Sequence, residues 1–573
     1  MIRYYLQIDN PLSSFIQVKT HIPISGKDTI FLQLPAWRPG RYELQNFAQK
    51  IQKFSVTDQN ENAVTYKKKT KDCWEVATTG LNEIQVNYNF YARQMDAGGS
   101  WVDETQLYVN PINLFLQVIN QEEATCEIFL DIPENWQIAC GLPQTRKNTL
   151  LAQNYDQLVD SPFIASSSLQ YIIYEVNNIP FYIWIQGNCI INWEKIKQDF
   201  TAFTQEQINL FGDFPVADYH FLNQILPYTH YHGVEHSNST VITLGPGELF
   251  MTPALYKEFI GISSHELFHT WNIKKIRPEE MLPYDFTKEN YFRTGYVAEG
   301  ITTYYGDYLL ARSGVFTCEQ YFTELNGVLA KHFTDYGHKN HSVAESSFDT
   351  WLDGYKTGIP DRKVSIYHKG ALAALILDLE IRRITQNKSS LDTVMLRLWE
   401  DFGKKNIGGY TEADYERLVE ETTHTTFTEY FQNIIYGTAP LPAYLEKALS
   451  YVGCTLNTQI NLTLSEGKFG FKTTVKENIL QVSGIAPHSP AAAVLSLEDE
   501  LIAINGRRIE GNFTILLSQA ETLELTLFRN KMLRQVTLIP DGMTYFPKYT
   551  VSKLPQATPE QKQNFATWLK QVF

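Results

Sequence analysis

The five residues from His265 to His269, with the sequence His-Glu-Leu-Phe-His, combine two metal-binding side chains with a carboxylate. On a helix, residues four apart lie on the same face, one turn from each other. His265 and His269 can therefore direct their imidazoles at one metal ion, while Glu266 accepts a proton from a water molecule at that ion. The spacing predicts a metal-dependent hydrolase. Taken alone, the string also fits two histidines on an ordinary helix face.

A zinc hydrolase of this kind needs three protein ligands and one position left for water. We expect Glu299 to be the third ligand, because it follows His269 by thirty residues on a second predicted helix, with room for one connecting loop. The alternative is a surface glutamate whose charge favours a helix start. Two histidine nitrogens exclude an all-oxygen Mg²⁺ or Ca²⁺ site, so the pattern predicts one Zn²⁺ per chain, although Co²⁺ and Mn²⁺ fit the same spacing.

Such a centre is suited to the hydrolysis of a peptide bond. The ion would lower the pKa of its water towards about 7 and polarise the peptide carbonyl. Glu266 would take the proton of that water and deliver it to the leaving amine. The oxyanion that results needs a second hydrogen-bond donor.

Composition restricts the class of protein that carries this centre. The chain has 573 residues, a formal net charge of −14, 43% hydrophobic residues and 20% charged residues, as soluble globular proteins do. A nucleic-acid partner is not expected, because phosphate binding needs a basic surface. No membrane partner is expected either, because no apolar run reaches the roughly 18–20 residues that span a bilayer.

The six cysteines are scattered along the chain without close pairs. This arrangement argues against a disulfide framework or a Cys-x-x-Cys metal site. The cysteines are Cys73, Cys126, Cys140, Cys189, Cys318 and Cys454. The first eight residues alternate like a strand and lack the charged start and apolar block of a secretory signal. The sequence therefore predicts a cytoplasmic protein with reduced thiols.

Elements from several parts of the chain must position the centre. Residues 1–165 alternate apolar and polar side chains in several runs, which predicts a β-sandwich-like N-terminal domain. Residues 166–454 begin with strands and turn to helical spacing, as expected of a mixed, mainly helical catalytic domain. Residues 455–545 return to short strands, and residues 546–573 form a tail with one short helix. We expect a multidomain α+β protein.

Six blocks of the chain share the pattern of one known family. They are Ser264–Pro278, Ala298–Gly300, Thr303–Tyr305, Gly233–Thr240, Tyr367–Leu372 and Pro35–Tyr42. Together they closely resemble the glycyl aminopeptidase family of gluzincin zinc metallopeptidases. The resemblance implies a thermolysin-like catalytic domain that removes N-terminal residues from peptides, with small residues such as glycine and alanine favoured.

The resemblance also implies roles for single residues. Carried over by position, His265, His269 and Glu299 bind zinc, and Glu266 is the general base. The phenol of Tyr367 would hydrogen-bond the developing oxyanion, a role that needs a neutral donor about 3 Å away. The alternative for this tyrosine is a half-buried aromatic side chain at the start of a helix.

A strand upstream of the metal motif supplies the substrate-binding candidates. By resemblance, Glu235 holds the free α-amino group of the substrate, with Gly233 and His236 beside it in the same strand. Cleavage would then be limited to the first peptide bond. Neighbouring histidines could also form a second metal site, but their spacing spreads them along a strand and a turn, which favours structural roles. These histidines are His220, His230, His232 and His236.

The C-terminal part resembles a PDZ domain of the type found on proteases. The resemblance rests on Lys468–Phe471, Val482–Ala492 and Leu497–Gly506. It implies that Phe469, Gly470 and Phe471 form a loop whose backbone N–H groups meet a peptide C-terminus. Two interpretations compete: the module adds a peptide as an extra strand, or it packs on the catalytic domain as a lid or brace.

The sequence thus predicts a zinc aminopeptidase that acts on peptides. One alternative is an endopeptidase with the same metal chemistry, to which the PDZ domain recruits protein substrates. The other is a catalytically silent peptide-binding protein on a peptidase scaffold. An open cleft without an acidic amine clamp would favour the first alternative, and failure to hold metal would favour the second.

Overall fold

Alternating apolar residues build a β-rich N-terminal domain over roughly the first 166 residues. The protein is described by a computed structural model, which covers residues 1–405, 408–519 and 521–573. The strand β7 (Glu83–Tyr91) of this domain buries alternate side chains from Ile84 to Phe90, because successive residues of a strand face opposite sides. Strands of three sheets share one apolar core, which contains Tyr4, Trp74 and Phe163.

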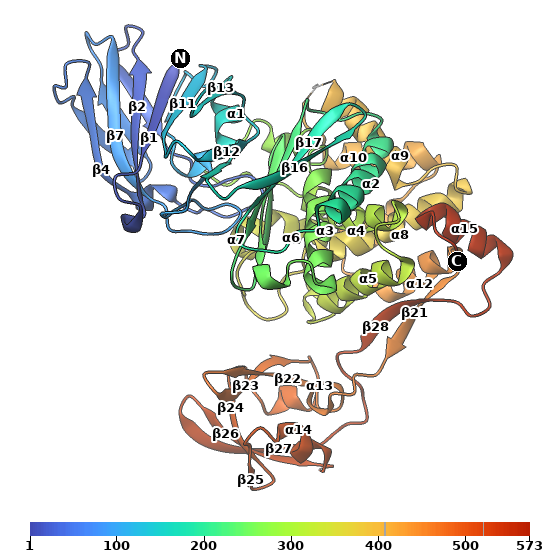
Figure 1. Ribbon diagram of the computed structural model, residues 1–573. Coiled ribbons are helices and arrows are strands. Elements are labelled where there is room, and N and C mark those ends of the chain that lie inside the picture. Colours follow the sequence, from blue (N-terminus) through green and yellow to red (C-terminus); the bar gives the residue numbers. More distant parts are fainter. Residues whose placement is uncertain (406–407, 520) are drawn as a thin grey trace.

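Three sheets form this domain, which is coloured blue in Figure 1. The first has the order β13 (Gln144–Arg146), β14 (Thr149–Ala152), β11 (Cys126–Asp131), β1 (Ile2–Gln7), β2 (Phe15–Pro23), β7 and β4 (Ile51–Asp58). The second has the order β10 (Gln117–Val118), β3 (Thr29–Gln33), β6 (Cys73–Ala77) and β5 (Tyr66–Thr70). The third has the order β12 (Gln137–Cys140), β15 (Phe163–Ser166), β9 (Gln106–Val109) and β8 (Trp101–Val102).

Residues 166–454, predicted as the catalytic domain and called the catalytic region below, start with a five-stranded sheet. Its order is β16 (Gln170–Val176), β17 (Ile179–Gln186), β18 (Tyr219–Ile225), β20 (Ser239–Gly245) and β19 (His230–Glu235). The pairs β17–β18 and β18–β20 are parallel, whereas β19 runs antiparallel to β20 and lies at the edge of the sheet. This edge strand packs against α3 (Pro253–Phe268), the helix that carries the metal motif.

Helices make up the rest of this region and enclose a large apolar core. The long ones are α2 (Trp193–Phe211), α3, α4 (Thr302–Arg312), α5 (Cys318–His332), α8 (His368–Thr385), α9 (Leu391–Leu398), α10 (Glu412–Thr423) and α12 (Leu441–Tyr451). The short ones are α1 (Tyr155–Val159) in the N-terminal domain, then α6 (Val343–Phe348), α7 (Thr350–Asp353) and α11 (Thr428–Tyr430). Among the described residues, no helix has both the length and the apolar character needed to cross a bilayer.

The C-terminal helix α15 (Pro559–Leu569) packs into the catalytic core. Trp568 is fully buried there. Its carbonyl accepts a hydrogen bond from the Tyr308 hydroxyl at 2.7 Å, and its indole N–H donates to the Tyr304 hydroxyl at 3.2 Å. In Figure 1 the red C-terminal helix accordingly lies beside the yellow helices.

A two-stranded ribbon carries a separate C-terminal module. In this ribbon β21 (Cys454–Gln459) pairs with β28 (Lys548–Lys553). Between them, β22 (Phe471–Lys476), β23 (Ile479–Ile485), β24 (Glu500–Ile504), β26 (Leu523–Arg529) and β27 (Met532–Leu538) form a sheet in this order, with β25 (Arg507–Arg508), α13 (Leu464–Gly467) and α14 (Phe513–Ser518). The predicted segment 455–545 therefore includes most of the ribbon strand β21, whereas its partner β28 lies in the predicted tail. The two ribbon strands together connect the module to the catalytic region.

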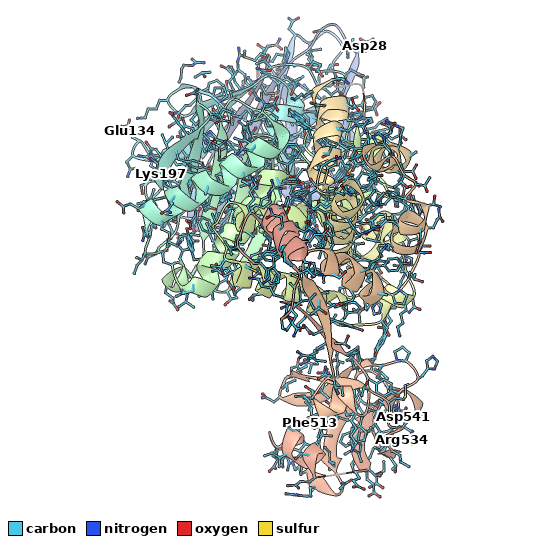
Figure 2. The ribbon with its side chains drawn as sticks, turned by 90° about the vertical axis from the view of Figure 1, so that its right-hand side faces the viewer. Asp28, Glu134, Lys197, Phe513, Arg534 and Asp541 are labelled. Carbon is cyan, nitrogen blue, oxygen red and sulfur yellow. The ribbon has the colours of Figure 1, made fainter. Side chains whose placement is uncertain are left out.

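Two views show that the module stands away from the other domains. Figure 1 places it below them, and in Figure 2 the labelled Phe513, Arg534 and Asp541 lie within the module, below the other domains. The module meets the catalytic region near Thr334, whose carbonyl accepts a hydrogen bond of 2.5 Å from the Lys472 ammonium.

Candidate metal centre and active site

The last turn of α3 brings the two histidines together, as the spacing of the motif requires. The two Nε2 atoms of His265 and His269 lie 3.1 Å apart. Helix α4 packs tightly on this turn: the Ser264 hydroxyl donates to the Gly306 carbonyl at 2.7 Å. A Cβ atom at Gly306 would lie only 3.3 Å from the Cα of His265. The glycine therefore lets the helix that follows Glu299 approach the motif.

Glu299 completes a cluster of three ligand atoms. It lies in a buried π-helical turn, Tyr296–Ile301, that leads directly into α4; such turns are frequent at functional sites. Its Oε2 atom is 3.3 Å from Nε2 of His269 and 4.0 Å from Nε2 of His265. Helix α8 crosses this turn so closely that a Cβ at Gly300 would be 2.5 Å from the Cα of Gly370.

The cluster fits a zinc ion by its donor set and by its spacing. The ligand atoms of His265, His269 and Glu299 lie within 4.8 Å of one another, and two imidazole nitrogens with one carboxylate are a typical zinc set. Burial lowers the pKa of His265 well below its usual value, which keeps this ring neutral. Burial opposes a proton on His269, but the Glu299 carboxylate outweighs it and raises the pKa of His269 to about 10. The cluster thus attracts positive charge where a metal ion would lie.

Two residues outside the predicted set hold these ligands in place. The carbonyl of Asn272 lies 2.9 Å from Nδ1 of His269, so that Nδ1–H donates to it and Nε2 is the nitrogen that faces the cluster. The Asn272 side chain itself donates to the carbonyl of Val297 at 2.8 Å, just before Glu299. The hydroxyl of Tyr42, from the N-terminal domain, donates to Oε1 of Glu299 at 2.9 Å. Both residues belong to blocks that the sequence singled out, but nothing in their spacing indicated these contacts.

Glu266 is buried beside the ligands and is 5% exposed. Within the described parts of the chain, its Oε2 atom has no hydrogen-bond partner. Burial raises the pKa of Glu266 well above its usual value, and the charges of Glu235 and Glu299 add to this effect, although His269 opposes it. The side chain is therefore poised to take up a proton, as a general base must.

Gly233 makes room for this carboxylate. A Cβ atom at position 233 would lie 2.2 Å from Oε1 of Glu266 and 2.9 Å from Cδ1 of Ile262. The glycine that the sequence grouped with substrate binding thus lies against the proposed base.

Glu235 also lies beside Glu266 and the metal cluster. The carboxylates of Glu235 and Glu266 and the imidazole of His269 have ligand atoms within 4.8 Å of one another. Glu235 is 3% exposed, and its Oε1 atom finds no hydrogen-bond partner among the described residues. A Cβ at Gly40 would be 2.5 Å from its Oε2 atom, so the N-terminal domain covers one side of this carboxylate. Glu235 therefore offers, within the described parts of the chain, a carboxylate oxygen without a hydrogen-bond partner next to the metal cluster.

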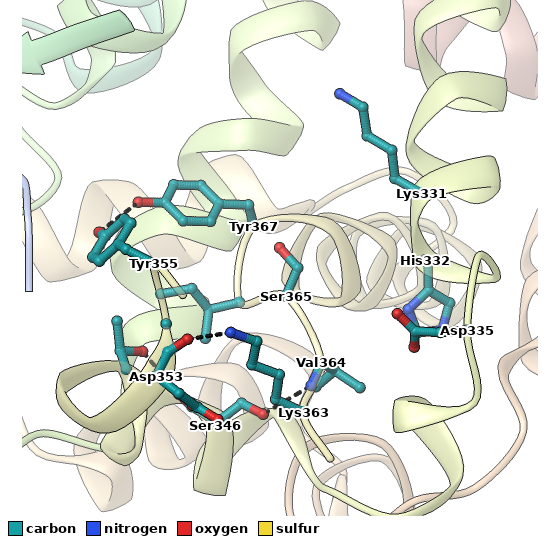
Figure 3. Close-up of a pocket in the computed structure, with 13 residues that line it drawn as sticks. Lys331, His332, Asp335, Ser346, Asp353, Tyr355, Lys363, Val364, Ser365 and Tyr367 are labelled. Atoms are coloured by element: carbon teal, nitrogen blue, oxygen red, sulfur yellow. Dashed lines mark hydrogen bonds between the residues drawn. The ribbon is translucent and has the colours of Figure 1, made fainter. Parts of the chain in front are cut away.

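Tyr367 precedes α8 and meets a second tyrosine. Its hydroxyl lies 3.3 Å from that of Tyr355, and Figure 3 shows the two phenols directed at each other. Burial raises the pKa of Tyr367 well above its usual value, and the Glu299 charge adds to this, so the phenol stays a neutral donor. The guanidinium of Arg41, from the N-terminal domain, lies over the Tyr355 ring at 4.9 Å.

Other predicted residues do not join this group. The Nδ1 atom of His236 lies 3.1 Å from Oδ1 of Asp160, which also accepts a hydrogen bond of 2.8 Å from the Lys274 ammonium. His236 therefore contacts Asp160 instead of joining the cluster, and it lies just beyond β19, which ends at Glu235. The prediction that His236 lies in the same strand as Glu235 was wrong. The side chains of Phe469 and Phe471 lie in the core of the separate C-terminal module.

The assembled groups face a cleft of about 800 Å³. Its walls come from the edge strand β19, from α3, α4 and α5, and from the N-terminal domain at Gly40 and Arg41. His265, Glu266 and Tyr367 all line it, so a peptide in the cleft can reach the cluster.

Comparisons with known proteins assign this site to a family. The model of the M61 peptidase N-terminal domain matches residues 3–167, and the model of M61 glycyl aminopeptidase matches residues 258–373, which include the metal cluster. The chain thus matches the M61 peptidase family over these two segments. These matches, together with the assembled site, make the protein a metallopeptidase, as the motif predicted.

One solved structure agrees with the fold over the whole chain. An aminopeptidase N family protein from Idiomarina loihiensis is 26% identical and matches with a TM-score of 0.90, covering 99% of this chain and 100% of that chain. The M1 zinc metallopeptidase of Deinococcus radiodurans is 14% identical and matches with a TM-score of 0.47, covering 77% of this chain and 94% of that chain. No curated protein matches the chain in sequence.

Proposed function

We propose that this protein is a zinc aminopeptidase that hydrolyses the first peptide bond of peptides. The observation that carries the proposal is the buried, unpaired carboxylate of Glu235 beside the metal cluster. An ammonium group is the natural partner for such a carboxylate, because a buried charge is costly unless it is paired. A substrate whose α-amino group meets Glu235 has its first peptide bond next to Glu266.

His265, His269 and Glu299 would hold one zinc ion per chain. When bound, the ion supplies Lewis-acid chemistry, which polarises a carbonyl group and makes water more acidic. Glu266 takes a proton from the attacking water and passes it to the leaving amine, which its raised pKa favours. Metal binding and proton transfer are thus carried out by different side chains of the cluster.

Tyr367 would stabilise the negative charge that develops on the carbonyl oxygen. Its phenol is a neutral donor that lines the cleft. Tyr355 supports the proposal, because its hydroxyl lies at hydrogen-bond distance from that of Tyr367 and restricts the orientation of the phenol.

The edge strand β19 would align the substrate backbone. It borders the cleft, and an edge strand can pair with an extended peptide. A preference for small first residues, glycine or alanine, follows from the description of the matched family as glycyl aminopeptidase. The thermolysin-like arrangement of strand and helices in residues 166–454 belongs to the same proposal.

Peptide pairs with free and acetylated N-termini test the proposal. The zinc-loaded protein should remove first residues stepwise from the free-amine peptides and leave their acetylated forms intact, as followed by mass spectrometry. Glu235→Ala should raise KM for the free-amine peptides. The control Glu258→Ala removes a carboxylate that lines the cleft but is not part of the buried cluster, and it should change little. Internal cuts in both peptide forms would instead identify an endopeptidase.

We further propose that the C-terminal module is a PDZ domain that binds peptide C-termini. Its support is the free edge of β22, next to the loop of Phe469, Gly470 and Phe471, where Gly470 has a φ of +78°. The N–H groups of Phe469 and Gly470 donate to carbonyls of the preceding turn, so a peptide carboxylate would have to take over these donors. Binding of a peptide with a free C-terminus, but not of its amidated form, is the expected result in calorimetry.

The unpaired state of the cysteine thiols is relevant to the cellular compartment of the protein. All six cysteines lie among the described residues and are unpaired. Free thiols are typical of a reducing compartment, and on this basis we place the protein in the cytoplasm.

A further inference from the structure

One loop of the N-terminal domain reaches into the metal centre. This centre loop, Trp37–Tyr42, is anchored in the catalytic region by Trp37, which is fully buried. The indole N–H of Trp37 donates to the carbonyl of Asp285 at 2.7 Å, and its ring meets that of Trp351 edge-on at 4.9 Å. Gly40, with a φ of +80°, lets the loop turn back towards the cluster.

Tyr42 ends the centre loop directly at a metal ligand. The residue is 1% exposed. Its ring packs at 5.1 Å from that of Phe292 and at 6.0 Å from that of Trp351. Since both partners belong to the catalytic region, the packing holds the phenol at a defined place relative to the cluster.

The hydrogen bond from Tyr42 gives the two carboxylate oxygens of Glu299 different partners. Oε1 accepts the bond from the Tyr42 hydroxyl at 2.9 Å, and Oε2 lies 3.3 Å from Nε2 of His269. A carboxylate without this bond can rotate about its last side-chain torsion, which is broad and weakly restricted. The hydroxyl therefore selects the oxygen that faces the histidines.

We propose that Tyr42 is a positioning residue for the zinc ligand Glu299, so that the N-terminal domain supplies part of the metal centre. The inference rests on the proposed zinc site. Groups that orient a ligand from outside the metal shell change metal affinity typically about 10–100-fold when they are removed. The N-terminal domain is then required for tight zinc binding, in addition to its contact with Glu235 through Gly40.

Zinc affinity of the full-length protein tests this role. Tyr42→Phe removes the hydroxyl and keeps the ring in its packing. The matched control is Tyr155→Phe, because Tyr155 is also buried in the N-terminal domain and donates to the carbonyl of Phe115 at 2.8 Å, away from the centre. The dissociation constant for zinc is measured by competition with a chromogenic chelator, and the melting temperature of each zinc-free protein reports folding.

We expect Tyr42→Phe to bind zinc about 10–100-fold more weakly than wild type, and Tyr155→Phe to bind it as wild type does. Similar melting of the two zinc-free variants would show that the weaker binding is not a folding defect. Zinc binding by Tyr42→Phe within threefold of wild type would overturn the inference and leave the proposed function standing. If the wild-type protein failed to bind zinc, as the ligand variant His269→Ala should, the proposed function would be overturned.

Discussion

Replacing Gly233 by alanine would displace the proposed general base. The added Cβ atom would lie 2.2 Å from Oε1 of Glu266, whereas ordinary van der Waals contact begins near 3.4 Å. The Glu266 carboxylate must therefore move by about 1 Å, and a displacement of this size in a catalytic site can lower the rate about 10²-fold. We expect kcat to fall about 10²-fold, equivalent to about 2.7 kcal/mol of activation free energy.

Folding should survive this substitution. The close contacts are with the end of the Glu266 side chain and with Cδ1 of Ile262, so the backbone need not shift. Alanine in place of glycine inside a strand is itself favourable by about 0.5–1 kcal/mol, which offsets part of the local repulsion. The free energy of unfolding should therefore change little, and zinc content should stay the same.

The assay compares kcat on a fluorogenic alanyl substrate with zinc content by mass spectrometry. Gly261→Ala is the matched control, because Gly261 lines the same cleft on α3 and its Cβ would meet only Oδ1 of Asp307, at 3.6 Å. Its kcat should stay within twofold of wild type. Glu266→Gln gives the limit for a lost base, with metal retained. If Gly233→Ala kept kcat within threefold of wild type, or lost zinc instead, the placement of Glu266 as the base next to Gly233 would be refuted.

Two further substitutions test the oxyanion donor and the junction between domains. Tyr367→Phe should lower kcat about 10²–10³-fold without loss of zinc; a kcat near that of wild type would assign the role to another donor. Asp160→Asn should lower the free energy of unfolding by about 3–5 kcal/mol, because it leaves the buried Lys274 ammonium without its charged partner. The double variant that also carries Lys274→Met should recover part of this loss. Urea unfolding measures both changes. Burial opposes the charge of Asp160, but Lys274 outweighs burial and depresses the pKa of Asp160. Its contribution to stability is therefore present above about pH 4 and lost as the pH falls further.

Local periodicity explains which parts of the site could be predicted from the sequence. The pairing of His265 with His269, and the position of Glu266 beside them, follow from helix geometry and need no other part of the chain. Alternating residues likewise predicted a β-rich N-terminal domain, and helical spacing predicted the elements that became α3, α4 and α8. The third ligand, Glu299, was predicted from its position on a second helix thirty residues beyond His269, and the family resemblance agreed with this choice. The donor Tyr367 was identified through the resemblance alone, since no local spacing connects it with the motif.

Tertiary packing decided the rest of the site. The contact of Tyr42 with Glu299 joins residues 257 positions apart, and the role of Gly233 depends on how closely β19 approaches α3. His236 was grouped with Glu235 in one strand, yet the strand ends at Glu235 and His236 contacts Asp160. The C-terminal helix was predicted as part of a tail, and the structure packs it into the catalytic core.

The sequence by itself determined that this protein carries a metal-binding motif with its own base, within a multidomain α+β chain. Only the tertiary structure decided that the N-terminal domain covers Glu235, hydrogen-bonds Glu299 and lines the same cleft. The physical reason is that helix and strand periods act over a few residues. Contacts between domains depend on the shape of surfaces that form only after those elements have packed.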